Sequence, residues 1–460
     1  MSVCNTKMKK RHIHFIGIGG IGVSGIAHLV LKQGEEVSGS DIKESAITRK
    51  LASLGARIYI GHRPESIEGA DLVVYSSAIQ LDNPEMTAAR KTGVPIRKRA
   101  EFLSELMKDK KVITVTGAHG KTTTSSLAAT LLIGVGLNPT IAVGGILRGE
   151  GDNAKLGGSD YFVAEADESD GTFLCYQPAY SIITNIDHEH MNFYKTYDNL
   201  LNSFSAFVAQ TKKGGCVFYY NDDAPLKDIV LKSNVRSVSF GFSREAGFYP
   251  ENIFLAQCRL GFSCIKGGHN VGEISLALMG RHNILNCLAV IALGFELGLD
   301  FEKIKYALSG FKGVERRFQV KYEDGDILIV DDYAHHPSEI AVTIEAAKVC
   351  PRSRLIVVFQ PHRYTRTKLL MDKFAKSFIK SDRLIITDVY AASEEPIESA
   401  SAQALAERVR QEINTPVDYI AKDQIVDFLR KNIRRNDMVL FLGAGDITKV
   451  SDEFTKRFKK

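Results

Sequence analysis

Two glycine-rich segments of this sequence have the residue types that bind phosphate groups. The more specific one, Gly117-Ala118-His119-Gly120-Lys121-Thr122-Thr123, follows an apolar run and opens a helical pattern. In such a loop the backbone N–H groups surround phosphate oxygens, the lysine neutralises the β- and γ-phosphates, and the next hydroxyl reaches Mg²⁺. Val115 stands where the longer Walker motif has its first glycine, so this is the shorter G-x-x-G-K-T-T form. The segment predicts an ATP site.

The other segment, Gly17-Ile18-Gly19-Gly20-Ile21-Gly22, lies between an apolar run and a helical pattern. Its glycines let the backbone approach a pyrophosphate closely at the helix N-terminus. Asp41 ends the next apolar run, about 20 residues later, where a Rossmann domain binds a ribose hydroxyl. From these residues alone a nucleotide diphosphate is expected here, and NAD is the commonest such ligand.

Two nucleotide-phosphate loops in one chain restrict the class of protein. A dehydrogenase or a small-molecule kinase needs one, whereas an enzyme that brings ATP to a nucleotide-linked substrate uses both. The formal net charge of +5 over 460 residues fits anionic substrates, and no run of lysine and arginine suggests a nucleic-acid partner. No apolar run is long enough for a membrane span.

Acidic and histidine residues at predicted strand ends are candidate metal ligands. Glu165 ends an apolar run in the position where an ATPase holds Mg²⁺. Asp167, Glu168 and Asp170 follow it, and each fits a solvated acid of a loop. His190 follows another strand end and is expected to bind metal. Neither segment has zinc-like spacing, so Mg²⁺ is the predicted ion.

Polar residues also follow two strands predicted in the last third of the chain. The ends of neighbouring parallel strands meet in one crevice, where Arg363 and Arg366, three residues apart, can grip an anionic group. Arg316 and Arg317 lie between predicted domains, from where a guanidinium could reach a γ-phosphate. The other candidates after these strands are Asp332, Tyr333, His335 and His362.

The elements that must position these residues alternate between strands and helices, which predicts parallel sheets covered by helices. We expect three α/β domains over residues 1–108, 109–313 and 314–460. The first and third are expected to be Rossmann-like and the central one to resemble P-loop ATPases. Residues 216–273, rich in short alternating runs, are expected to be an inserted β-rich piece. The seven scattered cysteines lack metal-site spacing and are expected to be free thiols.

Several of these motifs occur together, in order, in one known family. They are residues 14–22, 117–123, 164–170, 280–286, 316–317, 331–337 and 359–363, with Glu165 and His190. The set resembles the Mur ligase family, which also includes folylpolyglutamate synthases, over essentially the whole chain. Within the family the motifs look like those of the alanine-adding member.

The resemblance implies an ATP-dependent ligase that joins L-alanine to UDP-N-acetylmuramate through an acyl phosphate, in peptidoglycan precursor synthesis. It implies two Mg²⁺ ions, a cytoplasmic location and a monomer or homodimer, with no nucleic-acid or membrane partner. It also implies that the first domain binds UDP and not NAD.

The resemblance assigns expected roles to individual residues. The expected contacts to the UDP substrate are Gly17, Gly19, Gly20, Gly22, Asp41, His62, Ser77, Ala78 and His362. The expected ATP contacts are Gly117, Ala118, His119, Gly120, Lys121, Thr122, Thr123, His282, Asn283, Asn286, Asp332 and Tyr333. The expected catalytic residues are Lys121, His335, Arg317, Arg363 and Arg366, and the expected metal ligands are Thr122, Glu165 and His190.

Two alternatives stay open from the sequence. A sister ligase that adds a peptide to the same UDP sugar would share nearly every motif. An NAD-linked oxidoreductase joined to an ATPase module would share the two glycine loops.

Overall fold

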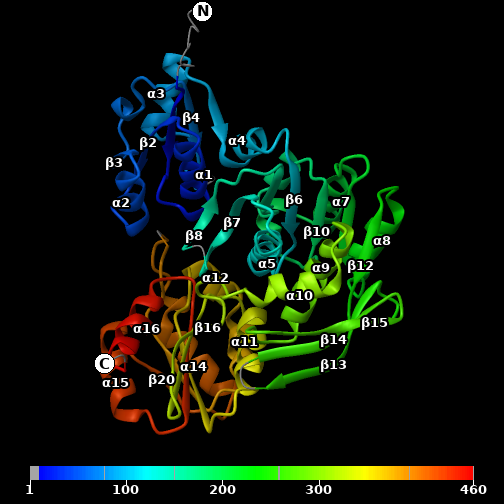
Figure 1. The fold of residues 1–460 in the computed structure, drawn as a ribbon. Coiled ribbons are helices and arrows are strands. Elements are labelled where there is room, and N and C mark those ends of the chain that lie inside the picture. The colour runs from blue at the N-terminus through cyan, green and yellow to red at the C-terminus, as the bar shows by residue number, and fades with distance from the viewer. Residues whose placement is uncertain (1–9, 77, 150, 257–258, 393, 459–460) are drawn as a thin grey trace, which may run out of the picture. The chain divides into compact units, whose positions relative to one another are not determined.

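A computed structural model describes residues 10–76, 78–149, 151–256, 259–392 and 394–458. Its contacts divide the chain into two units. Unit 1 comprises Met1–Glu251, Ser263–Gly272 and Leu285–Lys312, and unit 2 comprises Asn252–Phe262, Glu273–Ile284 and Gly313–Lys460. Three largely parallel sheets flanked by helices (Figure 1) confirm the predicted α/β class.

The first sheet lies in unit 1 and has the order β3-β2-β1-β4-β5, with every neighbouring pair parallel. Its central strand is buried along its whole length, as expected for a parallel strand covered on both faces. The strands are β1 (His12–Ile16), β2 (Glu36–Asp41), β3 (Arg57–Ile60), β4 (Leu72–Tyr75) and β5 (Ile96–Lys98). The helices are α1 (Ile21–Lys32), α2 (Ala46–Ser53), α3 (Pro84–Thr92) and α4 (Arg99–Leu106).

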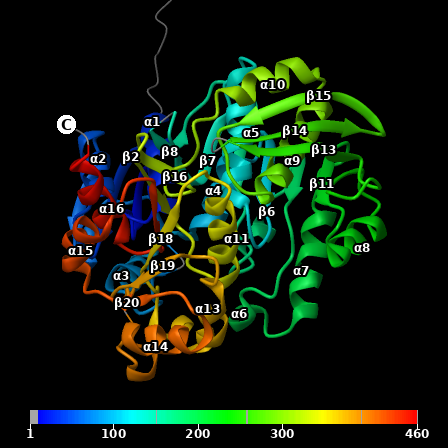
Figure 2. The same ribbon diagram turned by 90° about the horizontal axis from the view of Figure 1, so that it is seen from below.

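The second sheet has the order β15-β14-β13-β12-β11-β10-β6-β9-β7-β8. Helix α5 packs on β6, β7 and β9 (Figures 1 and 2). The strands are β6 (Lys111–Thr116), β7 (Thr140–Leu147), β8 (Asp152–Lys155), β9 (Tyr161–Glu165), β10 (Tyr180–Ile183), β11 (Cys216–Tyr220), β12 (Ser237–Phe240), β13 (Phe248–Ala256), β14 (Arg259–Lys266) and β15 (His269–Leu276). The helices are α5 (Lys121–Gly134), α6 (Met191–Tyr194), α7 (Tyr197–Ala209), α8 (Ala224–Lys232), α9 (His282–Glu296) and α10 (Phe301–Ser309).

The expectation of an inserted β-rich piece over residues 216–273 is only partly right. Strand β11 pairs in parallel with β10, and β12 pairs in parallel with β11, so they extend the main sheet. Helix α8 lies between them in sequence, as in an ordinary strand–helix–strand unit. Strands β13, β14 and β15 follow β12 as consecutive neighbours at the end of the same sheet.

The third sheet lies in unit 2 and has the order β16-β17-β21-β18-β19-β20. Successive residues of β17 enter different apolar layers, since Leu328 and Val330 pack on one face and Ile329 on the other. The strands are β16 (Gln319–Glu323), β17 (Ile327–Asp332), β18 (Arg354–Phe359), β19 (Arg383–Ile386), β20 (Val417–Tyr419) and β21 (Asp437–Leu442). The helices are α11 (Pro337–Lys348), α12 (Tyr364–Leu369), α13 (Met371–Ser377), α14 (Ala402–Glu412), α15 (Ile425–Asn432) and α16 (Ile447–Lys456).

Five cysteines lie in the described part of the chain, and all five are free thiols, as predicted. Cys4 and Cys258 fall outside the described residues. No helix in the described ranges has the length and apolar composition needed to span a bilayer.

Candidate active site

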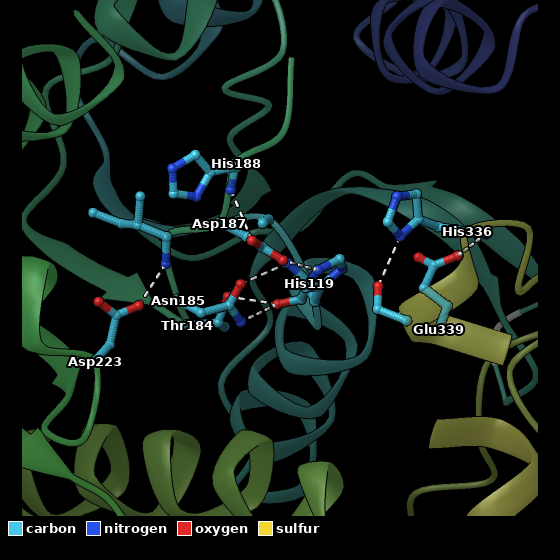
Figure 3. Close-up of polar contacts among 12 residues, drawn as sticks. His119, Thr184, Asn185, Asp187, His188, Asp223, His336 and Glu339 are labelled. Carbon is cyan, nitrogen blue, oxygen red and sulfur yellow. Dashed lines mark hydrogen bonds and ion pairs between the residues drawn. The ribbon is translucent and has the colours of Figure 1, made fainter. Parts of the chain in front are cut away.

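The loop between β6 and α5 is held in a phosphate-binding shape by the end of β10. A side chain at Gly117 would bring its Cβ within 2.4 Å of the Thr184 hydroxyl, so only glycine fits there. The Asn185 side chain accepts from the backbone N–H of His119 at 2.9 Å and donates to its carbonyl at 3.0 Å. The Thr184 hydroxyl donates to the same carbonyl at 2.6 Å (Figure 3). These hydrogen bonds fix the conformation of the predicted phosphate loop. The sequence did not predict that Thr184 and Asn185 would form them.

The charged end of Lys121 lies inside this loop. Its Nζ donates to the carbonyl of Gly117 at 2.7 Å and to Glu168 Oε1 at 2.9 Å. Burial alone would lower the pKa of Lys121, but Glu168 and the nearby acids outweigh it and raise the pKa. The lysine is therefore a permanent positive charge at the loop.

Glu168 contradicts the expectation of a solvated loop acid. The residue is 2% exposed, and its carboxylate contacts both Lys121 and His190, the latter at 3.5 Å from Nε2. Burial acts to raise the pKa of Glu168, but these two partners lower it below its usual value. The same hydrogen bond raises the pKa of His190. Glu168 thus joins the two residues that the sequence had singled out separately.

Glu165 lies at the end of β9, next to the first turn of α5. Its Oε2 accepts from the backbone N–H of Gly144, on β7, at 3.0 Å. Burial raises the pKa of Glu165, whereas Lys121 and the hydroxyl of Thr122 act to lower it. Thr122 itself is buried, with 8% exposure. A carboxylate and a hydroxyl are therefore adjacent at the mouth of the phosphate loop.

His119 extends from the loop toward a second acid. Its Nε2 lies 3.1 Å from Asp187 Oδ2, and the backbone N–H of His188 donates to the other oxygen of Asp187 (Figure 3). The His188 ring stacks on Tyr197 at 3.9 Å between centroids. The segment after β10 therefore lines one side of the loop.

The glycine loop of the first sheet is also built on a neighbouring strand end. The backbone N–H groups of Gly17 and Ile18 donate to the carbonyl of Ser40, at 2.9 and 3.0 Å. Asp41 Oδ2 accepts from the N–H of Gly19 at 2.9 Å. Asp41 was expected to bind a ribose, and the structure places its carboxylate on the loop backbone.

The expected UDP contacts His62 and Ala78 follow strands β3 and β4 of this sheet, whereas His362 belongs to unit 2. The exposed residue Ala78 follows β4, and Ser77 falls outside the described residues. His62 turns its Nδ1 toward Ser40 Oγ at 3.1 Å and toward Glu85 Oε2 at 3.4 Å. Glu85 is fully buried, so it fixes the orientation of the His62 ring.

Three expected ATP contacts lie on the first turns of α9. Asn286 belongs to the same unit as the phosphate loop, and a Cβ at Gly120 would come within 2.6 Å of its Oδ1. Asn283 donates to the carbonyl of Met279 at 2.6 Å, which stabilises the start of the helix. His282 is the first residue of α9.

Unit 2 gathers a second set of predicted residues after β17. Both carboxylate oxygens of Asp332 accept hydrogen bonds from backbone N–H groups, those of Phe318 at 2.6 Å and Ala334 at 2.8 Å. Burial raises the pKa of Asp332 to about 6, with Arg317 acting in the opposite direction. The guanidinium of Arg317 lies 5.3 Å from the centre of the Tyr333 ring.

His335 and His362 face each other within unit 2, with ring centres 5.7 Å apart. His335 Nδ1 lies 3.1 Å from the carbonyl of Tyr333, so this nitrogen carries the proton and Nε2 carries the lone pair. Burial lowers the pKa of His335, and it lowers that of His362 to about 4 with help from His335 and Arg366. Both rings are neutral near pH 7.

The arginines of unit 2 differ in their surroundings. Arg366 donates to His362 Nδ1 at 3.3 Å, so it lies in the histidine cluster. Arg363 precedes α12 with a positive φ of 71°, a strained conformation that turns the chain after β18. Arg316 bonds through Nη2 to the carbonyl of Gly443, which gives it a structural role. Of Arg316 and Arg317, Arg317 is therefore the better candidate for contacting a γ-phosphate.

Sequence reasoning missed several residues that build this site. Glu168 lies in the acidic segment after β9 that the sequence marked as a candidate, but the sequence did not indicate that its side chain is buried. Thr184 and Asn185, which precede His190 in the sequence, were not among the predicted site residues. Nothing in the sequence indicated the contacts of Asp187 or Glu85.

Comparisons with known proteins agree with this arrangement. Three family models match in order: the Mur ligase catalytic domain over residues 12–111, the Mur ligase middle domain over 115–294, and the Mur ligase glutamate ligase domain over 316–445. The chain belongs to the Mur ligase family, and it is an ATP-dependent ligase.

Three individual relatives show which members of the family this chain resembles. The UDP-N-acetylmuramate–L-alanine ligase of Syntrophobacter fumaroxidans is 44% identical over 98% of this chain and 96% of its own length. The crystal structure of the UDP-N-acetylmuramate–alanine ligase of Thermotoga maritima is similar with a TM-score of 0.86, 31% identity, and coverage of 97% of this chain and 99% of that one. A UDP-N-acetylmuramate:L-alanyl-γ-D-glutamyl-meso-diaminopimelate ligase from Neisseria meningitides is 29% identical, with a TM-score of 0.63, covering 67% of this chain and all of that one.

Proposed function

We propose that this enzyme joins L-alanine to the carboxylate of UDP-N-acetylmuramate, driven by ATP, in peptidoglycan precursor synthesis. The observation that carries the proposal is a phosphate loop with a partly buried lysine, in a chain that aligns over 98% of its length with a ligase named for this reaction. The solved structure named for a peptide-adding ligase is similar at a lower TM-score, 0.63 against 0.86 for the alanine ligase. This difference favours alanine as the acceptor.

In this proposal the UDP pyrophosphate binds at the glycine loop before α1. The helix N-terminus offers free N–H groups and the positive end of its dipole. His62, oriented by Glu85, and Ala78 contact the uridine in this proposal. Ser77, the third expected contact, falls outside the described residues. Asp41 acts first by shaping the loop through Gly19.

ATP binds at the loop between β6 and α5, where Lys121 neutralises the β- and γ-phosphates. His119 and Asn286 border the same loop. The further ATP contacts in the proposal are Gly117, Ala118, Gly120, Thr122, Thr123, His282, Asn283, Asp332 and Tyr333.

The residues beside this loop fit Mg²⁺. Glu165 offers a carboxylate, Thr122 a hydroxyl and His190 an imidazole. In the described ranges no group of three or more His, Cys, Asp and Glu side chains could hold a metal. Mg²⁺ commonly takes one or two protein carboxylates and completes its shell with phosphate and water oxygens. We assign two Mg²⁺ ions to these residues, and when bound they supply charge neutralisation at the phosphates.

The first chemical step is phosphoryl transfer. An oxygen of the muramate carboxylate forms a bond to the γ-phosphorus, the bond to the bridging oxygen breaks, and ADP leaves. The products are an acyl phosphate and ADP. Lys121 and Arg317 lower the barrier because they counter the charge of a carboxylate approaching a polyanion.

The second step forms the amide. The amine of L-alanine attacks the acyl carbon, a tetrahedral intermediate forms, and inorganic phosphate leaves. His335 accepts the amine proton at Nε2, which its Nδ1 bond to Tyr333 leaves as the basic nitrogen. His362, Arg363 and Arg366 hold the carboxylates of the substrates.

We also propose domain boundaries close to residues 108 and 313, since the three sheets fall into these segments. Because its substrates are ATP, a UDP sugar and an amino acid, we place the enzyme in the cytoplasm. We propose a monomer or homodimer, as the resemblance to the family implies.

The direct test is phosphate release from ATP with UDP-N-acetylmuramate, scanned over L-alanine, glycine, L-serine and the tripeptide. Release that depends on L-alanine is expected. Release with the tripeptide and not with alanine would assign the peptide-adding reaction instead. Calorimetry separates the oxidoreductase alternative, because the proposed site binds the UDP sugar and not NAD.

A further inference from the structure

The ammonium group of Lys121 is fully engaged within the protein. A lysine has three N–H donors. Here they meet three oxygen acceptors: the carbonyls of Gly117 at 2.7 Å and Ala118 at 3.4 Å, and Glu168 Oε1 at 2.9 Å. A phosphate oxygen that binds Lys121 must therefore replace one of them.

Glu168 is the acceptor whose chemistry most resembles a phosphate. It is an anion, whereas the other two acceptors are neutral carbonyls. Its side chain is 3% exposed, and its carboxylate also lies 3.5 Å from His190 Nε2. Its backbone carbonyl accepts from the hydroxyl of Tyr194, which ties the loop after β9 to α6. The carboxylate is thus held in place from two sides.

We propose that Glu168 is a positioning residue with two effects of opposite sign. It occupies Lys121 as a stand-in for the phosphate, so it weakens ATP binding. It also fixes His190 against the loop, so it speeds the chemical step. The inference rests on the proposed function only in that Lys121 binds an ATP phosphate.

Exchanging the Glu168 carboxylate for an ATP phosphate at Lys121 has a physical advantage. An ammonium partly removed from water is costly without a partner, so a lysine that binds ATP only part of the time is stabilised by a compensating charge. Because Glu168 supplies that charge, Lys121 stays in the loop in a single position. The penalty is that the nucleotide must compete with a carboxylate.

The experiment uses Glu168→Gln, which keeps the size and hydrogen-bonding capacity of the side chain but removes its charge. Affinity for ATP is measured by calorimetry in EDTA, with no UDP sugar or amino acid present, so that neither metal nor acceptor contributes. Turnover is measured separately with Mg²⁺ and all substrates. Asp170→Asn is the matched control, since Asp170 is an acid of the same loop that bonds to Thr172 and not to Lys121.

The expected result for Glu168→Gln is ATP binding tighter by several-fold, because a phosphate oxygen then replaces a neutral amide and not an anion at Lys121. Turnover should fall by about 10- to 100-fold, as for other residues that orient a functional histidine. The control should change neither. Weaker or unchanged ATP binding in EDTA, or unchanged turnover, would overturn the proposal.

A second variant guards against a folding defect. Glu168→Asp keeps the charge but withdraws it by one methylene, so it should also tighten ATP binding. Equal or weaker binding by that variant counts against the stand-in role. If alanine is the wrong acceptor, the parent enzyme itself shows no alanine-dependent turnover while the binding result stands, so the two failures are distinguishable.

Discussion

The side-chain amide of Asn153 donates a hydrogen bond of 2.6 Å to the backbone carbonyl of Ile21. This bond joins β8, of the second sheet, to the first turn of α1, beside the glycine loop of the first sheet. The neighbouring strand β7 carries Gly144, whose N–H bonds to Glu165. One β-hairpin therefore contacts both the first turn of the proposed UDP helix and a proposed metal ligand.

The adjacent residue, Asp152, predicts a pH-dependent contribution to stability. Burial acts to raise its pKa, but His28 at 2.9 Å and Lys50 at 2.8 Å lower it to about 2 from 3.8. Because the folded-state pKa is depressed, the stabilisation is complete above about pH 4 and disappears as the pH falls toward 2. Allowing for screening at the exposed lysine, it is worth roughly 1–2 kcal/mol.

Asp152→Asn should lower the free energy of unfolding at pH 7 by that amount, and the difference from the parent should shrink at pH 3. Urea denaturation at both values measures it. Asp228→Asn is the control, because Asp228 forms an exposed pair with Lys232 and should cost little. A difference that does not depend on pH would rule out the charge as its cause.

Lys121→Ala should reduce turnover by a factor on the order of 10³ or more, because it removes a fixed charge from the phosphates in a water-poor site. Steady-state kinetics measures the loss. The variant leaves Glu168 buried without its main partner, so a modest loss of stability is also expected. Activity within tenfold of the parent would refute the role of Lys121.

His190→Ala should impair acyl-phosphate formation by roughly 10²-fold while changing ATP affinity little. The reason is that Lys121 and the loop backbone still hold the nucleotide. Added Mg²⁺ should restore part of the rate by mass action, and Glu165→Ala should not add fully to the defect because both residues serve one metal cluster. Single-turnover ADP formation with UDP-N-acetylmuramate, without alanine, across a Mg²⁺ series is the measurement. ADP formation at the parent rate would show that His190 is structural.

His335→Ala should leave the first turnover of ADP formation near the parent rate and slow the alanine-dependent step by about 10²-fold. Since burial lowers the pKa of His335, its neutral form persists below pH 6.5, so the parent should keep the amide-forming step active there. Rapid-quench measurement of both products over pH 5–8 tests both statements. His336→Ala, whose ring bonds to Ser338, is the control. Equal loss in both steps would remove His335 from the proposed role.

The sequence by itself determined the elements whose signals are local. Apolar runs followed by glycine loops and helical patterns predicted β1 with α1 and β6 with α5. Strand periodicity and turn chemistry act over a few residues, so a single segment carries them. The motif order along the chain likewise indicated the family.

Only the tertiary structure decided which side chains meet. Glu168 and Lys121 are 47 residues apart, and nothing near either one in sequence tells a buried acid from a solvated one. Residues 216–273 looked like an insertion until the structure paired β11 with β10 and β12 with β11, because strand pairing depends on a partner elsewhere in the chain. The contact of Asn153 with Ile21 spans 132 residues. Burial and pairing are properties of the packed sheets, so the charge arrangement at the phosphate loop became visible only once those sheets were assembled.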